Sequence, residues 1–281
     1  MTATHQYPSI LDAVRGCLVE TCQCLNSTEL KYVVAGGWVP YLRSEGNALS
    51  HPGTNDVDIL LGSDWGAVKA ATLRLLERGY VPSAKHPFQI LKELSVAGRS
   101  FVFNVDLMYP TDDTEAVKTI KFKQILDLGV KNTAHQLESR FLASIPLPGM
   151  RIIFAQKLWA EFKIEGTLPS GENLSLEIPL MDESGLLISK CRSVDNVKRG
   201  RDAFDIFLLL SGRNVGDIVS KLTDLAKSSL EVKGEIRKLV EFLSKPDNSK
   251  TFDDRVRDYA ALDEAVSPAK SVMALLRPIS N

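Results

Sequence analysis

The sequence of 281 residues lacks several features, and each absence narrows what the protein can be. No apolar stretch approaches the roughly 20 residues that a membrane-spanning helix needs, so we expect no membrane association. The N-terminus has no basic segment followed by an apolar run, which is the pattern of a secretory signal peptide. Internal repeats and low-complexity tracts are also missing. These absences predict a cytoplasmic globular protein.

Cysteine and net charge are both scarce. The four cysteines are Cys17, Cys22, Cys24 and Cys191, and no His/Cys pair has the spacing of a zinc site, so we expect reduced, partly buried thiols. The formal net charge of −1 argues against a grossly basic nucleic-acid binder but allows a local basic patch. The contents of 44% hydrophobic and 25% charged residues are those of an ordinary globular core.

Apolar residues in the first half recur with both helical and strand spacing. Residues 8–25 and 63–78 are predicted to form helices, because their apolar side chains share one helical face. Residues 88–94 and 100–108 are predicted to form two strands that are joined by a turn at residues 97–99. The first half therefore predicts a mixture of strands and covering helices.

A short apolar run at residues 32–35 ends in two glycines, Gly36 and Gly37. The run predicts a strand, and paired glycines allow the backbone to approach a ligand closely. Backbone N–H groups in such a turn can face an anion such as a triphosphate. We therefore expect a phosphate-binding turn after this strand.

A second run at residues 57–61 carries Asp56 at its start and Asp58 within it. Side chains alternate along a strand, so both carboxylates are predicted to point to the same face. Mg²⁺ in enzymes is commonly held by one or two carboxylates together with substrate phosphates. The pair therefore predicts a site for Mg²⁺ or Mn²⁺ beside the glycine turn.

Asp106 is a charge within the apolar strand predicted at residues 100–108. It alternates onto the face that also receives Val102 and Asn104. A buried carboxylate without a partner is unfavourable, so Asp106 should face a metal, a cation or solvent.

The order of these motifs resembles the polymerase-β-like nucleotidyltransferase superfamily. That family has Gly-Gly or Gly-Ser at the end of one strand, Asp-x-Asp on the next, and often a third Asp on a neighbouring strand. The resemblance implies an α+β fold with a mixed sheet flanked by helices, and metal ligation by Asp56, Asp58 and Asp106. The present sequence has Trp38 where the family usually has Ser or Thr, and Gly-Gly-Trp occurs in the antibiotic-modifying branch.

Pro146 and Pro148 mark a change towards helical spacing. We therefore expect a nucleotidyltransferase domain at residues 1–148 and a helical C-terminal domain at residues 149–281, with an inserted loop or hairpin near residues 167–190. The further predicted helices are residues 152–166, 194–210, 215–227, 231–244, 252–259 and 262–276.

The helix predicted at residues 194–210 carries Arg201, Asp202 and Asp205. Lys198 and Asp202, like Arg201 and Asp205, are four residues apart. Taken alone, this spacing predicts surface ion pairs that contribute only a few tenths of a kcal/mol each.

Together with an earlier segment, this cluster resembles the abortive-infection AbiEii-type nucleotidyltransferase toxins. The residues that carry the resemblance are Ala155, Lys157, Leu158, Ala160, Arg201, Asp202 and Asp205. In that family a Lys and a later Asp complete the active site from the helical domain. The resemblance implies that these are Lys157 and Asp202, with Asp205 as the alternative to Asp202.

The resemblance implies transfer of NMP from an NTP in the presence of Mg²⁺ or Mn²⁺. Gly36 and Gly37 would cradle the triphosphate, Lys157 would neutralise phosphate charge, and Asp106 could accept the acceptor's proton. The implied nucleotide-binding set is Gly36, Gly37, Trp38, Lys157, Arg201 and Asp205.

The acceptor is left open by the sequence. The favoured interpretation is a toxin-like enzyme that modifies RNA, most readily tRNA, or a protein, and that pairs with a cognate antitoxin. Lys198 and Arg199 would contact the phosphates of an RNA acceptor. Gly-Gly-Trp favours instead an enzyme that modifies an aminoglycoside or lincosamide. A third interpretation is a catalytically inactive protein that binds a nucleotide or a partner.

Overall fold

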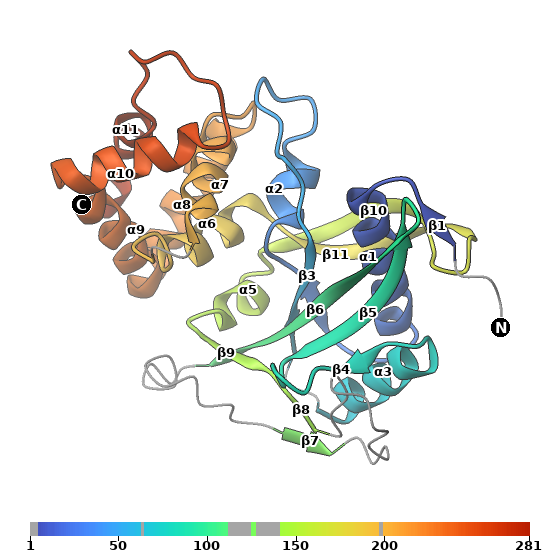
Figure 1. Cartoon of the computed structure of the whole chain (residues 1–281). Helices are drawn as coiled ribbons and strands as arrows, with labels where there is room; N and C mark the ends of the chain where they lie inside the picture. Colours follow the sequence, from blue (N-terminus) through green and yellow to red (C-terminus); the bar gives the residue numbers. More distant parts are fainter. Residues whose placement is uncertain (1–4, 63–64, 112–124, 128–140, 197–198) are drawn as a thin grey trace. The chain divides into compact units, whose positions relative to one another are not determined.

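The computed structural model describes residues 5–62, 65–111, 125–127, 141–196 and 199–281 (Figure 1). The chain forms two compact units. The first contains residues 1–38 and 53–181, and the second contains residues 39–52 and 182–281. Residues 149–181, which the sequence analysis placed in a helical C-terminal domain, therefore belong to the first unit.

A mixed sheet of nine strands organises the first unit, and the α+β fold class is confirmed. Its main path runs β1-β5-β6-β3-β2-β11-β10, while β4 pairs with β5 and β9 pairs with β6. The strands are β1 Gln6–Tyr7, β2 Tyr32–Val34, β3 Asp56–Leu61, β4 Val81–Pro82, β5 Gln89–Val96, β6 Arg99–Thr111, β9 Ile145–Pro148, β10 Trp159–Thr167 and β11 Asn173–Met181. A separate pair joins β7 Ile125–Asp127 to β8 Phe141–Ala143.

The two faces of the sheet have different environments. On β3 and β6, one face carries apolar residues that are all buried: Val57, Ile59, Leu61, Phe103, Val105 and Leu107. Because Lys92 of β5 is paired with Phe103 and reaches Glu20 of α1 (Ile10–Asn26), this core face lies under that helix. The opposite face carries Asp56, Asp58 and Asp106, and we call it the carboxylate face.

The predicted first-half elements are confirmed. The helix expected at residues 8–25 is α1, capped by Ser9, whose side chain accepts a hydrogen bond from Asp12 N–H. The helix expected at residues 63–78 is α3, Trp65–Glu77, and the first two residues of the expected range lie outside the described residues. The strands β5 and β6 are joined at Ala97 and Gly98, both with positive φ (47° and 78°).

The helix expected at residues 152–166 is a wrong prediction. Only α5, Arg151–Ala155, is helical, and the chain then enters β10, which forms a nine-residue antiparallel hairpin with β11. The spacing of Ile152, Ile153 and Leu158 suggested a helix, but Phe162 and Ile164 also fit strand alternation, and pairing with β11 selects the strand. Of the loop or hairpin that was expected near residues 167–190, the hairpin is present, but it begins earlier, at Trp159, and ends at Met181.

The second unit is helical. Its elements are α2 Trp38–Arg43 (whose first residue belongs to the first unit), α6 Glu183–Cys191, α7 Arg201–Leu210, α8 Val215–Ser228, α9 Leu230–Leu243, α10 Pro246–Arg257 and α11 Pro268–Ser280. The last four correspond to predicted helices. The helix expected at residues 194–210 is shorter than predicted, because α7 begins at Arg201. The helix α6 was not predicted, and it lies almost wholly in the range of the expected insert. Within the described residues, no helix combines the length and apolarity needed to cross a membrane.

Candidate active site

The glycine turn lies directly against a carboxylate. Gly36 has a φ of +63°, which disfavours other residues, and a Cβ added there would lie 1.7 Å from Asp58 Oδ2. A backbone hydrogen bond also joins the two segments here, in which the N–H of Ala35 donates to the Asp58 carbonyl oxygen at 2.9 Å. The group that lies against this glycine is thus Asp58, and the predicted approach of the turn to a triphosphate stays a prediction.

Asp56, Asp58 and Asp106 are brought together by the strand register. In the parallel pair β3–β6, Asp58 is opposite Asp106 and Asp56 is opposite Asn104. Residues opposite each other on neighbouring strands point to the same face, so all three carboxylates share the carboxylate face. Each is half-buried. Asp56 Oδ1 also accepts a hydrogen bond from Thr54 Oγ1 at 2.5 Å.

Asp106 has two amide partners that the sequence analysis missed. Asn104 Nδ2 and Gln89 Nε2 donate to Asp106 Oδ1 at 2.7 Å and 3.0 Å. Burial raises the pKa of Asp106 above its usual value, and the nearby Asp56 charge adds to this, while the two hydrogen bonds oppose it. The alternation of Asn104 with Asp106 was visible in the sequence, whereas Gln89 could be found only from the β5–β6 register.

Trp38 supports the site from inside the first unit. Its side chain is fully buried, and its indole N–H donates to the backbone oxygen of Asp56 at 2.9 Å. This corrects the sequence-based expectation that Trp38 would contact the nucleotide, because a fully buried ring presents no surface to a ligand. Its contact fixes the start of β3, which carries the first carboxylate.

Lys157 lies in the turn between α5 and β10 and not on a helix. Lys157 has a φ of +48°. The N–H of Lys157 donates to the Phe154 carbonyl oxygen at 3.3 Å, and the N–H of Leu158 donates to the Ile153 carbonyl oxygen at 2.8 Å. This pair of bonds is the Schellman ending of a helix, in which the residue at Lys157 is usually glycine. The exposed ammonium of Lys157 lies 5.2 Å from the ring centre of Trp159.

Asp202 and Asp205 belong to a buried charge network within the second unit. Lys190 Nζ lies 2.5 Å from Asp202 Oδ1 and 2.8 Å from Asp205 Oδ2. Ser193 Oγ donates to Asp202 Oδ2 at 2.5 Å, and His51 Nε2 lies 3.1 Å from Asp205 Oδ1. Asp202 is 5% exposed and Asp205 is 0% exposed, so these are not the surface ion pairs that the helical spacing suggested.

The cation of this network is Lys190, which the sequence analysis did not select. Burial alone would lower the pKa of Lys190, but Asp205 and Asp202 outweigh it and raise the pKa above its usual value. The resemblance implied that Lys157 and Asp202 complete one active site, but both oxygens of Asp202 already have partners in its own unit. Of the other predicted residues, Arg201 begins α7 and is half-buried, and Lys198 lies outside the described residues.

The donor set suits a hard cation only with help from a ligand. Within the described ranges, no three His, Cys, Asp or Glu side chains are arranged to hold a metal ion by themselves. Mg²⁺ often takes one or two carboxylates and completes its shell with phosphate oxygens and water. Asp56 and Asp58 supply that pair on one face. The carboxylates therefore fit a metal that arrives with a phosphate-bearing substrate.

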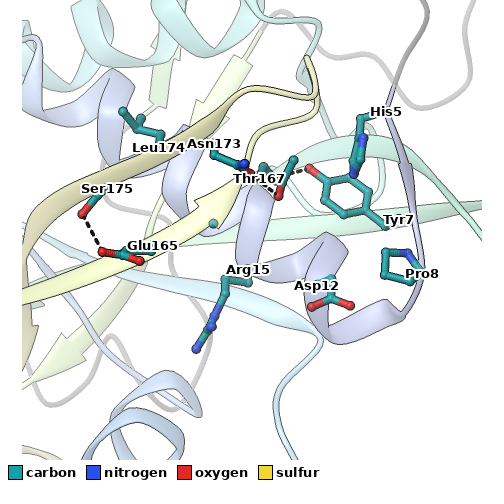
Figure 2. Close-up of a pocket in the computed structure, with 11 residues that line it drawn as sticks. His5, Tyr7, Pro8, Asp12, Arg15, Glu165, Thr167, Asn173, Leu174 and Ser175 are labelled. Carbon is teal, nitrogen blue, oxygen red and sulfur yellow. Dashed lines mark hydrogen bonds between the residues drawn. The ribbon is translucent and has the colours of Figure 1, made fainter.

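A cavity of about 590 Å³ lies at the end of β10 that is far from Trp159 (Figure 2). It is lined by β1, the start of α1 and the β10–β11 hairpin, with Asp12, Arg15 and Glu165 as its charged side chains. Figure 2 shows Tyr7 and Thr167 joined across it by a hydrogen bond of 2.7 Å. Since Glu165 is six residues along β10 from Trp159, about 20 Å separates this cavity from the start of the strand.

Among known proteins, similarity is found to solved structures alone. No family model matches the sequence, and no curated protein matches it. Two solved structures from Helicobacter pylori align over 97% of the chain, each with a TM-score of 0.41. One is described as a candidate nucleotidyltransferase, with 12% identity and 96% of its own chain covered. The other is JHP933, with 10% identity and 93% of its chain covered.

Proposed function

We propose that the protein is a metal-dependent nucleotidyltransferase that transfers NMP from an NTP. The observation that carries the proposal is the register of β3 and β6, which places Asp56, Asp58 and Asp106 on one face, with Gly36 against Asp58. Carboxylates beside a glycine turn are the elements that phosphoryl-group transfer requires, because the turn receives phosphates and the carboxylates receive their metal.

Each residue then has a defined task. Asp56 and Asp58 would hold Mg²⁺ or Mn²⁺, which when bound neutralises phosphate charge and activates an acceptor hydroxyl. The backbone N–H groups of the turn at Gly36 and Gly37 would bind the triphosphate beside Asp58. Asp106, held by Asn104 and Gln89, is the group positioned to accept the acceptor's proton.

Lys157 can supply a cation to this site from the first unit. Its turn precedes Trp159, which pairs with Met181 at the end of β11, and β11 runs parallel to β2 towards Gly36. The turn is thus at the same end of the sheet as the glycines. A lysine there can neutralise phosphate oxygens as a compact, mobile charge.

We extend the proposal to a macromolecular acceptor, with RNA and specifically tRNA as the first candidate, in a toxin–antitoxin or phage-defence setting. The support is the order of motifs that resembles the AbiEii-type toxins, together with basic residues at Lys198 and Arg199. Phosphate contacts from such residues would position RNA without reading its sequence.

Asp58→Ala is the direct test. We expect loss of Mg²⁺-dependent NTP turnover with little change in the melting temperature, because Asp58 is half-buried and its removal creates no apolar cavity. Asp254→Ala in α10 is the matched control, since that aspartate lies in the second unit and its side chain pairs with the exposed Lys250. Wild-type turnover in Asp58→Ala would reject the proposed site.

The acceptor is tested with labelled NTPs, total RNA and a panel of aminoglycosides and lincosamides. Label on RNA, with slowed bacterial growth that Asp58→Ala abolishes, supports the macromolecular acceptor. Label on a drug and no effect on growth would favour antibiotic modification. If neither RNA, protein nor drug is labelled while NTP still binds, the protein is a binding module and the transferase proposal is wrong.

A further inference from the structure

Trp159 lies in the same row of the sheet as two of the site carboxylates. In β10–β11, Trp159 is opposite Met181, and the pairing of Leu180 with Val34 places Met181 beside Ala35. The N–H of Ala35 bonds to Asp58, which is opposite Asp106. The row therefore reads Trp159, Met181, Ala35, Asp58, Asp106, and residues of one row share a face.

This row separates the indole from the metal-binding residues by a ligand-sized interval. Three strand spacings lie between β10 and β3, which corresponds to about 14 Å along the sheet. A nucleoside triphosphate is elongated, with its base and its phosphates at opposite ends, so it could span this interval.

We propose that Trp159 is the platform on which the base of the NTP stacks. This inference depends on the proposed function, because it takes the ligand of the carboxylates to be a nucleotide. The side chain of Trp159 is half-buried, which leaves part of the ring available, unlike the fully buried Trp38. Stacking of a base on an aromatic side chain contributes about 1–3 kcal/mol, and it tolerates any base.

Lys157 has two roles in this subsite. Its ammonium lies 5.2 Å from the ring centre of Trp159, within the range of a cation–π contact. The base replaces this ammonium on the ring, and the released cation turns towards the phosphates of the same ligand. The turn keeps a lysine at a φ of +48° where glycine would be favoured, which is consistent with a side chain retained for use.

The proposal predicts weak selectivity among nucleotides. A base that stacks on the Trp159 ring contacts only the face of that ring. The buried residues of the row, Met181 and Ala35, have no polar side-chain group that could hydrogen-bond to the edge of a base. Purine nucleotides should bind more tightly than pyrimidine nucleotides, because the larger rings overlap more of the indole.

The test compares an NTP with inorganic tripolyphosphate, which carries the phosphates but no base. Both are titrated calorimetrically in the presence of Mg²⁺ into wild type, Trp159→Ala and Trp159→Phe. We expect Trp159→Ala to weaken ATP binding at least tenfold and to leave tripolyphosphate binding unchanged. Trp159→Phe should recover most of the ATP affinity. Glu161→Ala is the matched control, since this exposed residue follows on the same face of β10 and should alter neither affinity.

The outcomes separate this inference from the proposed function. If wild type binds both ligands and Trp159→Ala binds ATP as tightly, the platform is rejected and the nucleotide site stands. If Trp159→Ala loses both ligands equally, the ring supports the fold of the site and does not stack on a base, which also rejects the platform. If wild type binds neither ligand, the proposed function itself fails.

Discussion

At the scale of single residues, Gly36 provides the sharpest test of the geometry. In Gly36→Ala the added Cβ would lie 1.7 Å from Asp58 Oδ2, so the carboxylate must move. We expect NTP turnover to fall at least a hundredfold, which corresponds to about 2.7 kcal/mol in the activation free energy. Steady-state kinetics with Mg²⁺ provides the measurement.

The matched control is Gly46→Ala. Gly46 also has a positive φ, of +78°, but the atoms nearest to its added Cβ belong to the Arg213 guanidinium at 3.8 Å and beyond. Both variants carry similar backbone strain, of about 1 kcal/mol. Activity should be lost in Gly36→Ala alone; equal losses in both variants would show that strain, and not displacement of Asp58, is responsible.

Replacing Lys157 by glycine is predicted to raise the stability of the protein and to lower its activity. Lys157→Gly relieves a left-handed conformation and should raise the free energy of unfolding by up to about 1 kcal/mol. The same change removes the cation near the phosphates, so turnover should fall about tenfold or more. Thermal denaturation and kinetics on the same preparation test both effects, and a variant that is stabilised but fully active would exclude a role for this side chain.

At the scale of elements, the crossing of α1 over the ends of β1 and β10 depends on Gly16. An added Cβ there would lie 2.2 Å from Tyr7 Oη and 2.4 Å from the Thr167 carbonyl, the two groups that form the bond across the Figure 2 cavity. We expect Gly16→Ala to lower the free energy of unfolding by about 1–3 kcal/mol, because overpacking forces the helix away.

Gly234→Ala in α9 is the corresponding control for helix propensity, since no described atom lies within 4 Å of its added Cβ. That variant should gain about 0.5–1 kcal/mol. Urea denaturation gives both values. A stabilised Gly16→Ala would mean that the crossing is looser than the structure shows.

The buried network between α6 and α7 should make stability depend on pH. Burial would raise the pKa of Asp205, but Lys190 and the His51 hydrogen bond outweigh it, and the pKa lies below its usual value. A carboxylate whose pKa is depressed in the folded state contributes stability above its unfolded pKa of about 3.9 and loses it as pH falls through the folded value. Lys190, His51 and Asp202 are the titratable groups around it.

Asp205→Asn should therefore be less stable than wild type at pH 7, and the difference should shrink as the pH is lowered below about 4. Urea midpoints measured at pH 7 and pH 3 give this difference at each pH. A difference that is the same at both values would mean that the charge of Asp205 contributes nothing to stability.

At the scale of the whole molecule, the sequence was informative where local pattern determines structure. The glycine turn, the alternation that places Asp56 and Asp58 together, and the capped α1 follow from spacing and propensity within one element. The prediction of reduced and partly buried thiols also agrees with four free cysteines, all of which are buried.

The failures share a physical cause, which is dependence on partners that are distant in the chain. Residues 159–167 become a strand because β11 pairs with them, and Gln89 reaches Asp106 because β5 runs beside β6. Lys190 could not be identified from the sequence as the partner of Asp202, since only folding of α6 against α7 brings it within reach. Helical spacing on α7 suggested surface pairs because the sequence alone does not show burial.

The assignment of residues 39–52 to the second unit has a consequence for how the two halves could be separated. The polypeptide crosses between the units three times, near residues 38, 52 and 181. A chain that stops at residue 181 would retain His51 without Asp205, and Asn47 without the backbone N–H of Arg213. The glycine turn and the first carboxylates are thus connected in the chain by residues 39–52, whose packing partners come about 150 residues later in the sequence. Truncation at residue 181 therefore leaves the second unit incomplete, whereas the first unit alone corresponds to residues 1–38 joined by a linker to residues 53–181.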